Sequence, residues 1–289
     1  MYKALAPHAI GMNPVDLETA LKLAAESGFQ GLELNARDIA SRVKAKGSDS
    51  VKSLFHAAGV VPAAFGFTVD IRAEEDAYRV SVGELASLAS ACASVGCLRT
   101  GTWILSGSNE LDFSANRDFH LKRLTPVATV LADCGVRLAL EFLGPLTIRE
   151  RFTHPFVCDL AGMLELAHDV SPNTGLLLDA WHWYTSHGTL ESLRALTNEN
   201  VVMVHVNDAP VGVEIDAQVD NTRALPGETG VIDIAGFLKA LDAAGYDGPV
   251  TPEPFKRSLS ELPSDSDRAQ LVGSAMDAIF RSAGVTPIV

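Results

Sequence analysis

The chain has 289 residues, 47% of them hydrophobic, and its formal net charge is −13. That length is typical of an α/β barrel held as one domain, and the apolar content is enough to bury a sizeable core. The acidic balance argues against nucleic acid or anionic membranes as partners, and favours small substrates that are neutral or held by a metal.

The four cysteines, Cys92, Cys97, Cys134 and Cys158, show no metal-ligand spacing and are too few for a disulfide framework. We therefore expect reduced, buried thiols. The first thirteen residues lack the apolar core of a signal peptide, and no apolar run approaches the ~20 residues that span a bilayer. These features predict a soluble, cytoplasmic protein.

Short apolar runs alternate with longer amphipathic stretches along the whole chain. A near-continuous run of Val, Leu, Ile and Ala is typical of strands buried on both faces. We expect eight strands, at 4–10, 31–34, 60–65, 98–103, 136–141, 176–179, 201–206 and 249–253. Helical spacing with Pro and Gly boundary signals predicts helices from Asn13-Pro14 to Gly28, then over 84–95, 121–134, 233–244 and about 265–283.

Eight strand–helix units predict a closed parallel barrel of the α/β class, the (β/α)8 or TIM barrel. No linker-like run of Pro, Gly or Ser divides the chain, so residues 1–289 are expected to form a single domain. The alternative is a doubly wound open sheet, which usually carries a glycine-rich phosphate loop after its first strand. This sequence has none.

Five of the expected strands finish with an ionisable residue, and such positions carry the chemistry of barrel enzymes. They are Glu33, Glu141, Asp179, His205 and Glu253. Each alone is more often a helix cap, a solvated loop residue or a hydrogen-bonded histidine. The last four, however, end successive strands that converge on one mouth, and three carboxylates so close need a cation between them. Oxygen ligands with one imidazole suit Mn²⁺, Mg²⁺, Co²⁺ or Zn²⁺, and the lack of cysteine argues against a structural zinc.

Two further residues are candidates for substrate binding. His182 follows Asp179 by three positions and could reach the same mouth, although Trp181, Trp183 and Tyr184 beside it could simply pack over the rim. Arg223 follows a polar stretch over 212–222 that is expected to form a loop over the mouth. It could orient a substrate oxygen, or form a surface ion pair with Asp220 or Glu228. Glu228 itself is expected to be structural.

The segments LALEFLGP, GLLLDAWHWY, VHVNDAP and RALPGETGVIDIAGFLKALDAAGYDGPVTPEPF resemble the xylose-isomerase-like barrel superfamily. Within it they look most like the sugar phosphate isomerase/epimerase group, especially inosose (2-keto-myo-inositol) isomerases. The resemblance is strongest over 136–256 and absent over 104–118. It implies one divalent metal ion, with Mn²⁺ as first choice, on Glu141, Asp179, His205 and Glu253. It also implies acid/base duty for Glu141 and Glu253, substrate contacts at His182 and Arg223, and a homo-oligomer, dimer or tetramer. Pro252 departs from the family pattern and could re-aim Glu253.

The expected function is therefore metal-dependent isomerisation or epimerisation of a small sugar or polyol ketone, through an enediolate. One carboxylate removes a proton beside the ketone and the other returns one. A lyase or dehydratase acting on a keto-sugar or keto-glycoside would use the same residues, and a non-catalytic sugar-binding barrel is a further alternative. A DNA-repair endonuclease on this barrel would need more histidines at the mouth and a basic face.

Overall fold

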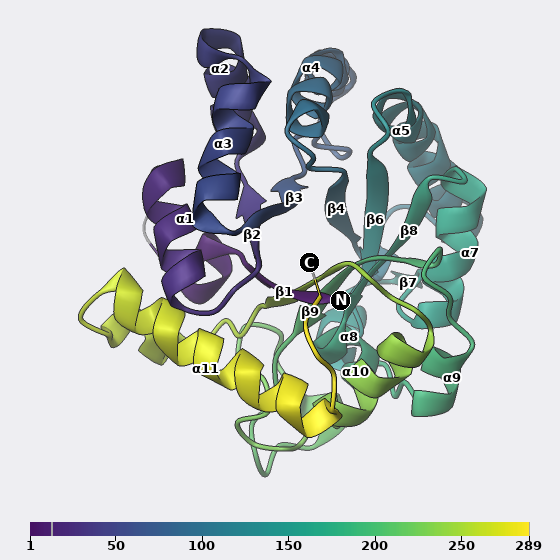
Figure 1. The fold of residues 1–289 in the computed structure, drawn as a ribbon. Helices are drawn as coiled ribbons and strands as arrows, with labels where there is room; N and C mark the ends of the chain where they lie inside the picture. The colour runs from purple at the N-terminus through teal and green to yellow at the C-terminus, as the bar shows by residue number, and fades with distance from the viewer. Residues whose placement is uncertain (13, 289) are drawn as a thin grey trace.

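Eight parallel strands close into a barrel that is ringed by helices (Figure 1). The computed structural model describes residues 1–12 and 14–288. Around the barrel the strand order is β1 (Tyr2–Leu5), β10 (Pro249–Pro252), β9 (Val201–Val206), β8 (Thr174–Asp179), β6 (Arg137–Phe142), β4 (Arg99–Ile104), β3 (Val61–Gly66) and β2 (Gly31–Leu34). The expected (β/α)8 barrel is confirmed.

Helices and short 3-10 turns fill the connections between the strands. The helices are α1 (Leu17–Glu26), α2 (Ala36–Lys46), α3 (Ser48–Ala58), α4 (Glu75–Ser94), α5 (Phe113–Asp133), α6 (Leu146–Arg149), α7 (Leu160–Val170), α8 (Ala180–Thr185), α9 (Leu190–Arg194), α10 (Ile234–Ala243) and α11 (Asp265–Ala283). The 3-10 turns are η1 (Pro7–Ile10), η2 (Ile215–Ala217) and η3 (Arg257–Glu261). Among the residues that the structure describes, no helix is both long and apolar enough to cross a membrane.

The strands are buried on both faces, which explains their continuous apolar runs. Every residue of β6 after Arg137, and every residue of β8 and β9, is buried. Small and flexible side chains fill the barrel interior, among them Ala64, Ala139 and Leu177. A Cβ on Gly101 would lie 2.9 Å from the Ala139 Cβ, so this layer has no room for a side chain there. The larger apolar side chains pack between strands and helices.

The ends of several elements differ from the sequence expectation. The first strand covers 2–5, and 7–10 forms η1 because Pro7 begins a 3-10 turn. Helix α1 begins at Leu17, where the Asp16 carboxylate accepts the Thr19 N–H at 2.7 Å. The expected cap at Asn13 lies outside the described residues. Helices α10 and α11 begin where the sequence indicates.

Helices α4 and α5 each begin about two turns before the expected positions. The first turns of α4 are largely exposed, and Tyr78 and Val82 alone pack on the core before Leu85, so the apolar repeat there is sparse. Helix α5 begins after Asp112, whose carboxylate accepts the Ala115 N–H at 2.9 Å. Within the stretch 104–118, β5 (Gly107–Ser108) pairs antiparallel with β7 (His154–Pro155), outside the barrel.

All four cysteines are free thiols, in agreement with the sequence. Cys92 and Cys97 are buried, and burial raises the pKa of both thiols. Cys134 and Cys158 are only partly buried, so the expectation of four buried cysteines is wrong for these two. Cys134 caps the end of α5, and its sulfur donates to the Ala86 carbonyl of α4 at 3.8 Å.

Candidate metal centre

Four ionisable side chains from adjacent strand ends meet at the barrel mouth. Glu141 comes from β6, Asp179 from β8, His205 from β9, and Glu253 directly follows β10. One ligand atom from each lies within 4.8 Å of the others. The His205 Nδ1 is 3.9 Å from Glu141 Oε1 and 3.6 Å from Glu253 Oε2. The convergence predicted from the sequence is therefore present in the structure.

Strand register brings these side chains to one face. Asp179 pairs with His205 in the parallel β8–β9 ladder, and paired residues of parallel strands point to the same side of a sheet. Pro252 does not turn Glu253 away. Pro252 pairs with Val206, and the Glu253 N–H donates to the Val206 carbonyl at 2.9 Å. The ladder thus continues through the proline and places the Glu253 carboxylate in the cluster.

Arg223 is the cation that joins the cluster to the covering loop. Its Nη1 lies 2.8 Å from Asp179 Oδ2 and 3.0 Å from Glu253 Oε2, and its Nη2 lies 2.8 Å from Asp220 Oδ1. Only 5% of the residue is exposed. The pairing with Asp220 that the sequence suggested is present but buried. Glu228 instead pairs with Lys256 and accepts the Leu225 N–H at 2.8 Å, which is the structural role expected for it.

His182 lies at the edge of the same cluster. The Gly144 N–H donates to its Nδ1 at 3.3 Å, which assigns the ring proton to Nε2. Nε2 lies 3.4 Å from Arg223 Nη2 and 3.8 Å from Asp220 Oδ1. A Cβ on Gly144 would stand 2.2 Å from the His182 carbonyl oxygen, so the glycine permits this approach. The structure thus brings together all six residues selected from the sequence.

The neighbouring aromatic side chains pack in the core. Trp181 is fully buried, and Trp183 lies against Phe237 of α10 with ring centroids 5.4 Å apart. The packing interpretation is therefore correct for these two tryptophans. The stretch 212–222 contains η2 and leads to Arg223, and its Gln218 carbonyl accepts the Thr147 hydroxyl at 2.8 Å. As expected, this stretch lies beside the cluster.

The carboxyl groups of the cluster have opposite protonation tendencies. Burial, reinforced by the Glu253 carboxylate, raises the pKa of Glu141 well above its usual range. Burial opposes ionisation of Asp179 too, but Arg223 and the two histidines lower its pKa to about 2. The Glu253 pKa is also lowered, because His205 and Arg223 outweigh its burial. Burial disfavours a charged His205, yet Glu253 and Glu141 raise its pKa to about 10.

The donor set fits a divalent cation. Glu141 Oε1 and both ring nitrogens of His205 are buried and have no hydrogen-bond partner among the described residues. Buried polar atoms normally find partners, and leaving them without one costs roughly 1–3 kcal/mol each. Carboxylate oxygens with one imidazole are ligands that Mn²⁺, Mg²⁺, Co²⁺ and Zn²⁺ accept. A cation among these atoms would satisfy the Glu141 oxygen and one of the two His205 nitrogens.

Sequence reasoning missed three residues near the cluster. Asn207 is buried and donates from its side-chain amide to Asp179 Oδ1 at 2.9 Å. Asp208 accepts the N–H groups of Thr229, Gly230 and Ile232, and so anchors the PGETG segment. Both directly follow the His205 strand in VHVND, which is the signal that could have found them.

Trp103 is the third missed residue. It pairs in register with Glu141 on the neighbouring parallel strand, so both side chains point toward the barrel axis. Trp103 is 46% exposed at the mouth, and the Arg72 guanidinium lies 4.3 Å from its ring centroid. The sequence alone shows Trp103 only as the last apolar residue of an expected strand.

Comparison with known proteins places this barrel in a family. Over 260 residues the chain is 24% identical to the inosose isomerase of Bacillus velezensis, a match covering 86% of this chain and 87% of that protein. A stretch of 93 residues is 32% identical to the 3-dehydroshikimate dehydratase of Pseudomonas aeruginosa, covering 32% of this chain and 14% of that protein.

Two solved structures share the whole fold. A xylose isomerase domain protein from Alicyclobacillus acidocaldarius superposes with a TM-score of 0.84 at 28% identity, covering 98% of this chain and 99% of that one. The IolI protein with a bound zinc atom superposes with a TM-score of 0.78 at 21% identity, over 98% and 99% of the two chains. Residues 21–281 match the family model described as xylose isomerase-like TIM barrel. The chain therefore belongs to the xylose isomerase-like TIM barrel family, whose members include isomerases and dehydratases.

Proposed function

We propose that this protein is a divalent-metal-dependent isomerase or epimerase of a small sugar or polyol ketone, with an inosose as the first candidate substrate. The observation that carries the proposal is the buried cluster of Glu141, Asp179, His205 and Glu253, whose unpaired atoms face one another at the barrel mouth. The likeness to inosose isomerases, from the sequence motifs and from the whole-length match, supports the choice of substrate.

The proposed cofactor is one divalent ion held by these four residues, with Mn²⁺ as first choice and Mg²⁺, Co²⁺ or Zn²⁺ as alternatives. Zinc gains support from the zinc atom in the similar IolI structure. When bound, the ion would hold the substrate oxygens and stabilise the negative charge that develops on them after loss of a neighbouring proton. All proton transfers are left to side chains of the protein.

The two glutamates are suited to opposite halves of the proton transfer. In the metal-free protein burial raises the pKa of Glu141, whereas His205 and Arg223 lower the pKa of Glu253, and on this basis Glu253 is the proposed base and Glu141 the proposed acid. Glu141 reaches the mouth from β6 and Glu253 from the end of β10, and β8 and β9 lie between these two strands in the barrel. Return of the proton to the opposite face of the same carbon gives an epimer. Return to the adjacent carbon gives an isomer.

Arg223 and His182 are the proposed substrate-positioning residues. The Arg223 guanidinium keeps Asp179 and Glu253 in place, and its Nη2 turns toward His182 Nε2. A substrate hydroxyl beside this pair would accept from the guanidinium and the imidazole N–H. The charged fork of Arg223 would thereby fix the reacting carbon between the two glutamates.

A metal-dependent dehydratase is the second candidate. It is supported by the 32% identity of one segment to 3-dehydroshikimate dehydratase. The enediolate left after proton removal would expel the hydroxyl from the carbon beyond the deprotonated one, in place of taking a proton back on carbon. Glu141, as the proposed acid, would then protonate the leaving oxygen. The residues required are the same, so product analysis has to separate the two candidates.

The proposal is tested by solvent exchange of carbon-bound hydrogen. The Mn²⁺-loaded chain is incubated in D₂O with a panel of inososes, ketoses and related polyhydroxy ketones, and proton NMR follows each carbon. We expect deuterium beside the carbonyl of at least one ketone, with a new stereocentre, a moved carbonyl or a lost hydroxyl reporting the outcome. The control is Glu253→Gln, which has the same shape but no base. If the metal-loaded wild type exchanges no ketone of the panel, the proposal is wrong and a sugar-binding barrel becomes the better account.

A further inference from the structure

Asn207 carries a buried amide whose side-chain hydrogen bonds all go to residues of the candidate metal centre. It directly follows β9, two positions after His205, and is fully buried. Its Nδ2 donates to Asp179 Oδ1 at 2.9 Å and to the Glu253 carbonyl at 3.4 Å. Its Oδ1 is buried and has no hydrogen-bond partner among the described residues. Such an oxygen is unfavourable, so the fold alone gives no reason for an amide at this position.

The neighbours of Asn207 decide which way its amide points. The Asp179 carboxylate, which is paired with Arg223 at 2.8 Å, and the Glu253 carbonyl are both acceptors. Only the NH₂ end of the amide can bond to them, and the reverse orientation would bring oxygen against oxygen. Asn207 is therefore a donor to Asp179.

The two oxygens of Asp179 differ in the bonds that they can still accept. Oδ1 accepts the Asn207 Nδ2 and also the Trp181 N–H at 2.7 Å, which begins α8. A carboxylate oxygen has about two lone-pair sites, so both sites of Oδ1 are used. Oδ2 accepts the Arg223 Nη1 at 2.8 Å and keeps one site. Asp179 is therefore left with one oxygen, Oδ2, for a cation.

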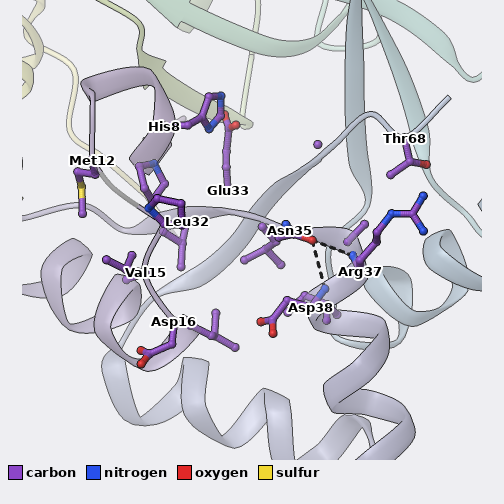
Figure 2. Close-up of a pocket in the computed structure, with 18 of the residues that line it drawn as sticks. His8, Met12, Val15, Asp16, Leu32, Glu33, Asn35, Arg37, Asp38 and Thr68 are labelled. Carbon is purple, nitrogen blue, oxygen red and sulfur yellow. Dashed lines mark hydrogen bonds between the residues drawn. The ribbon is translucent and has the colours of Figure 1, made fainter. Parts of the chain in front are cut away.

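The mouth is open on the side opposite Asp179. Strand β2 lies across the barrel from β8, four strands away in either direction. A groove of about 710 Å³ lies there, at the ends of β1, β2 and β3, and Figure 2 shows Glu33 on its wall. Glu33 Oε1 accepts the Thr251 hydroxyl at 2.9 Å, and Thr251 pairs in register with His205. Water in the groove therefore has a route toward the cluster on the side away from Asn207.

We propose that Asn207 is a positioning residue that limits Asp179 to one metal-binding oxygen and so keeps coordination positions free for the substrate. This inference rests on the proposed function, because it concerns the proposed divalent ion. Each of the four cluster residues offers one ligand atom, and octahedral coordination then has two positions left. Without the Asn207 amide, Asp179 Oδ1 loses one of its two donors and becomes available as a further ligand. A carboxylate that binds through both oxygens takes up one of the free positions.

The test counts the water molecules on Mn²⁺ bound to the whole chain. Water-proton relaxation reports the rapidly exchanging waters on the bound ion, with no substrate present. We expect about two for the wild type and about one for Asn207→Leu, which has nearly the same size and no donor. Calorimetry should give Asn207→Leu a Mn²⁺ affinity equal to or above that of the wild type, because the change removes no ligand.

Asn173→Leu is the matched control. The Asn173 amide donates to the Ala128 and Val136 carbonyls, at 3.0 Å each, and makes no hydrogen bond to the cluster. Its loss should lower Tm and leave the number of waters on Mn²⁺ as in the wild type. If Asn207→Leu does not fold, Asn207→Val removes the same donor with a smaller side chain, and the same loss of one water is expected.

An Asn207→Leu protein that keeps as many waters as the wild type would overturn the inference, and so would one that no longer binds Mn²⁺. Either result, in a chain whose wild type exchanges ketone hydrogens, overturns only the role of Asn207. The expected loss of water in a chain that exchanges no ketone overturns only the proposed reaction. A wild type that binds no Mn²⁺ overturns both.

Discussion

Replacing Arg223 by Met should destabilise the metal-free protein strongly. The guanidinium is buried between Asp179, Glu253 and Asp220, at 2.8, 3.0 and 2.8 Å. Met has a similar length and no charge, so the substitution leaves these carboxylates without their counter-ion. Removing one partner of a buried ion pair typically costs about 3–5 kcal/mol. For a chain of this size that lowers Tm by roughly 10 °C.

The same change should be partly rescued by metal. A divalent ion among Asp179, Glu253 and their neighbours replaces the lost positive charge, so the Tm difference between variant and wild type should narrow when Mn²⁺ is added. Thermal unfolding is followed by circular dichroism in EDTA and in Mn²⁺. Arg223→Lys is the control, because it keeps the positive charge but not the planar guanidinium. Its Tm in EDTA should lie between that of Arg223→Met and that of the wild type. A Tm for Arg223→Met within about one degree of wild type in EDTA would refute the assigned role of Arg223.

Three further predictions concern catalysis, pH dependence and assembly. Glu141→Gln and Glu253→Gln should each lower kcat by about 10²-fold or more while metal stays bound, because each removes a group that carries a proton. Steady-state assays use the ketone identified by the exchange experiment, and a near-normal kcat for either variant excludes the substituted residue as a proton carrier. Burial lowers the pKa of His120 to about 4 from its ordinary 6.5. The neutral form therefore stabilises the fold above pH 6.5, and up to about 3 kcal/mol of the free energy of unfolding is lost as the pH falls from 6.5 toward 4. His120→Asn keeps a donor for the Asn116 carbonyl and should flatten this part of the pH dependence in urea titrations; an unchanged slope contradicts the assignment. The family resemblance predicts a dimer or tetramer, and light scattering at micromolar concentration that gives the mass of one chain would contradict it.

The barrel and the cluster could be predicted because both depend on local sequence patterns. Apolar runs mark strands that are buried on both faces, and the residue that ends each run lies at the mouth once the sheet closes. Glu141, Asp179, His205 and Glu253 therefore needed only the order of elements. Helix starts were less predictable. The first turns of α4 carry only a sparse apolar repeat, and the Asp16 cap competes with the Asn13-Pro14 signal.

The remaining parts of the site depend on side-chain contacts between distant segments. Arg223 is a polar loop residue in the sequence, and only the folded chain shows it bridging two cluster carboxylates. Trp103 faces the mouth because of its register with Glu141, which apolar composition does not reveal. The groove beside Glu33 forms where the first turns of α1 and α2 approach the ends of three strands. No single segment encodes that space.

The metal content of the purified chain tests the central claim most directly. Elemental analysis after reconstitution with Mn²⁺ and removal of free ion should give one divalent ion per chain. Asp179→Ala and His205→Ala should each lose it while keeping the circular dichroism of the barrel, because each removes one of the four ligands. An intact wild-type barrel that retains no divalent ion after reconstitution would contradict the metal centre and, with it, the proposed proton-transfer chemistry.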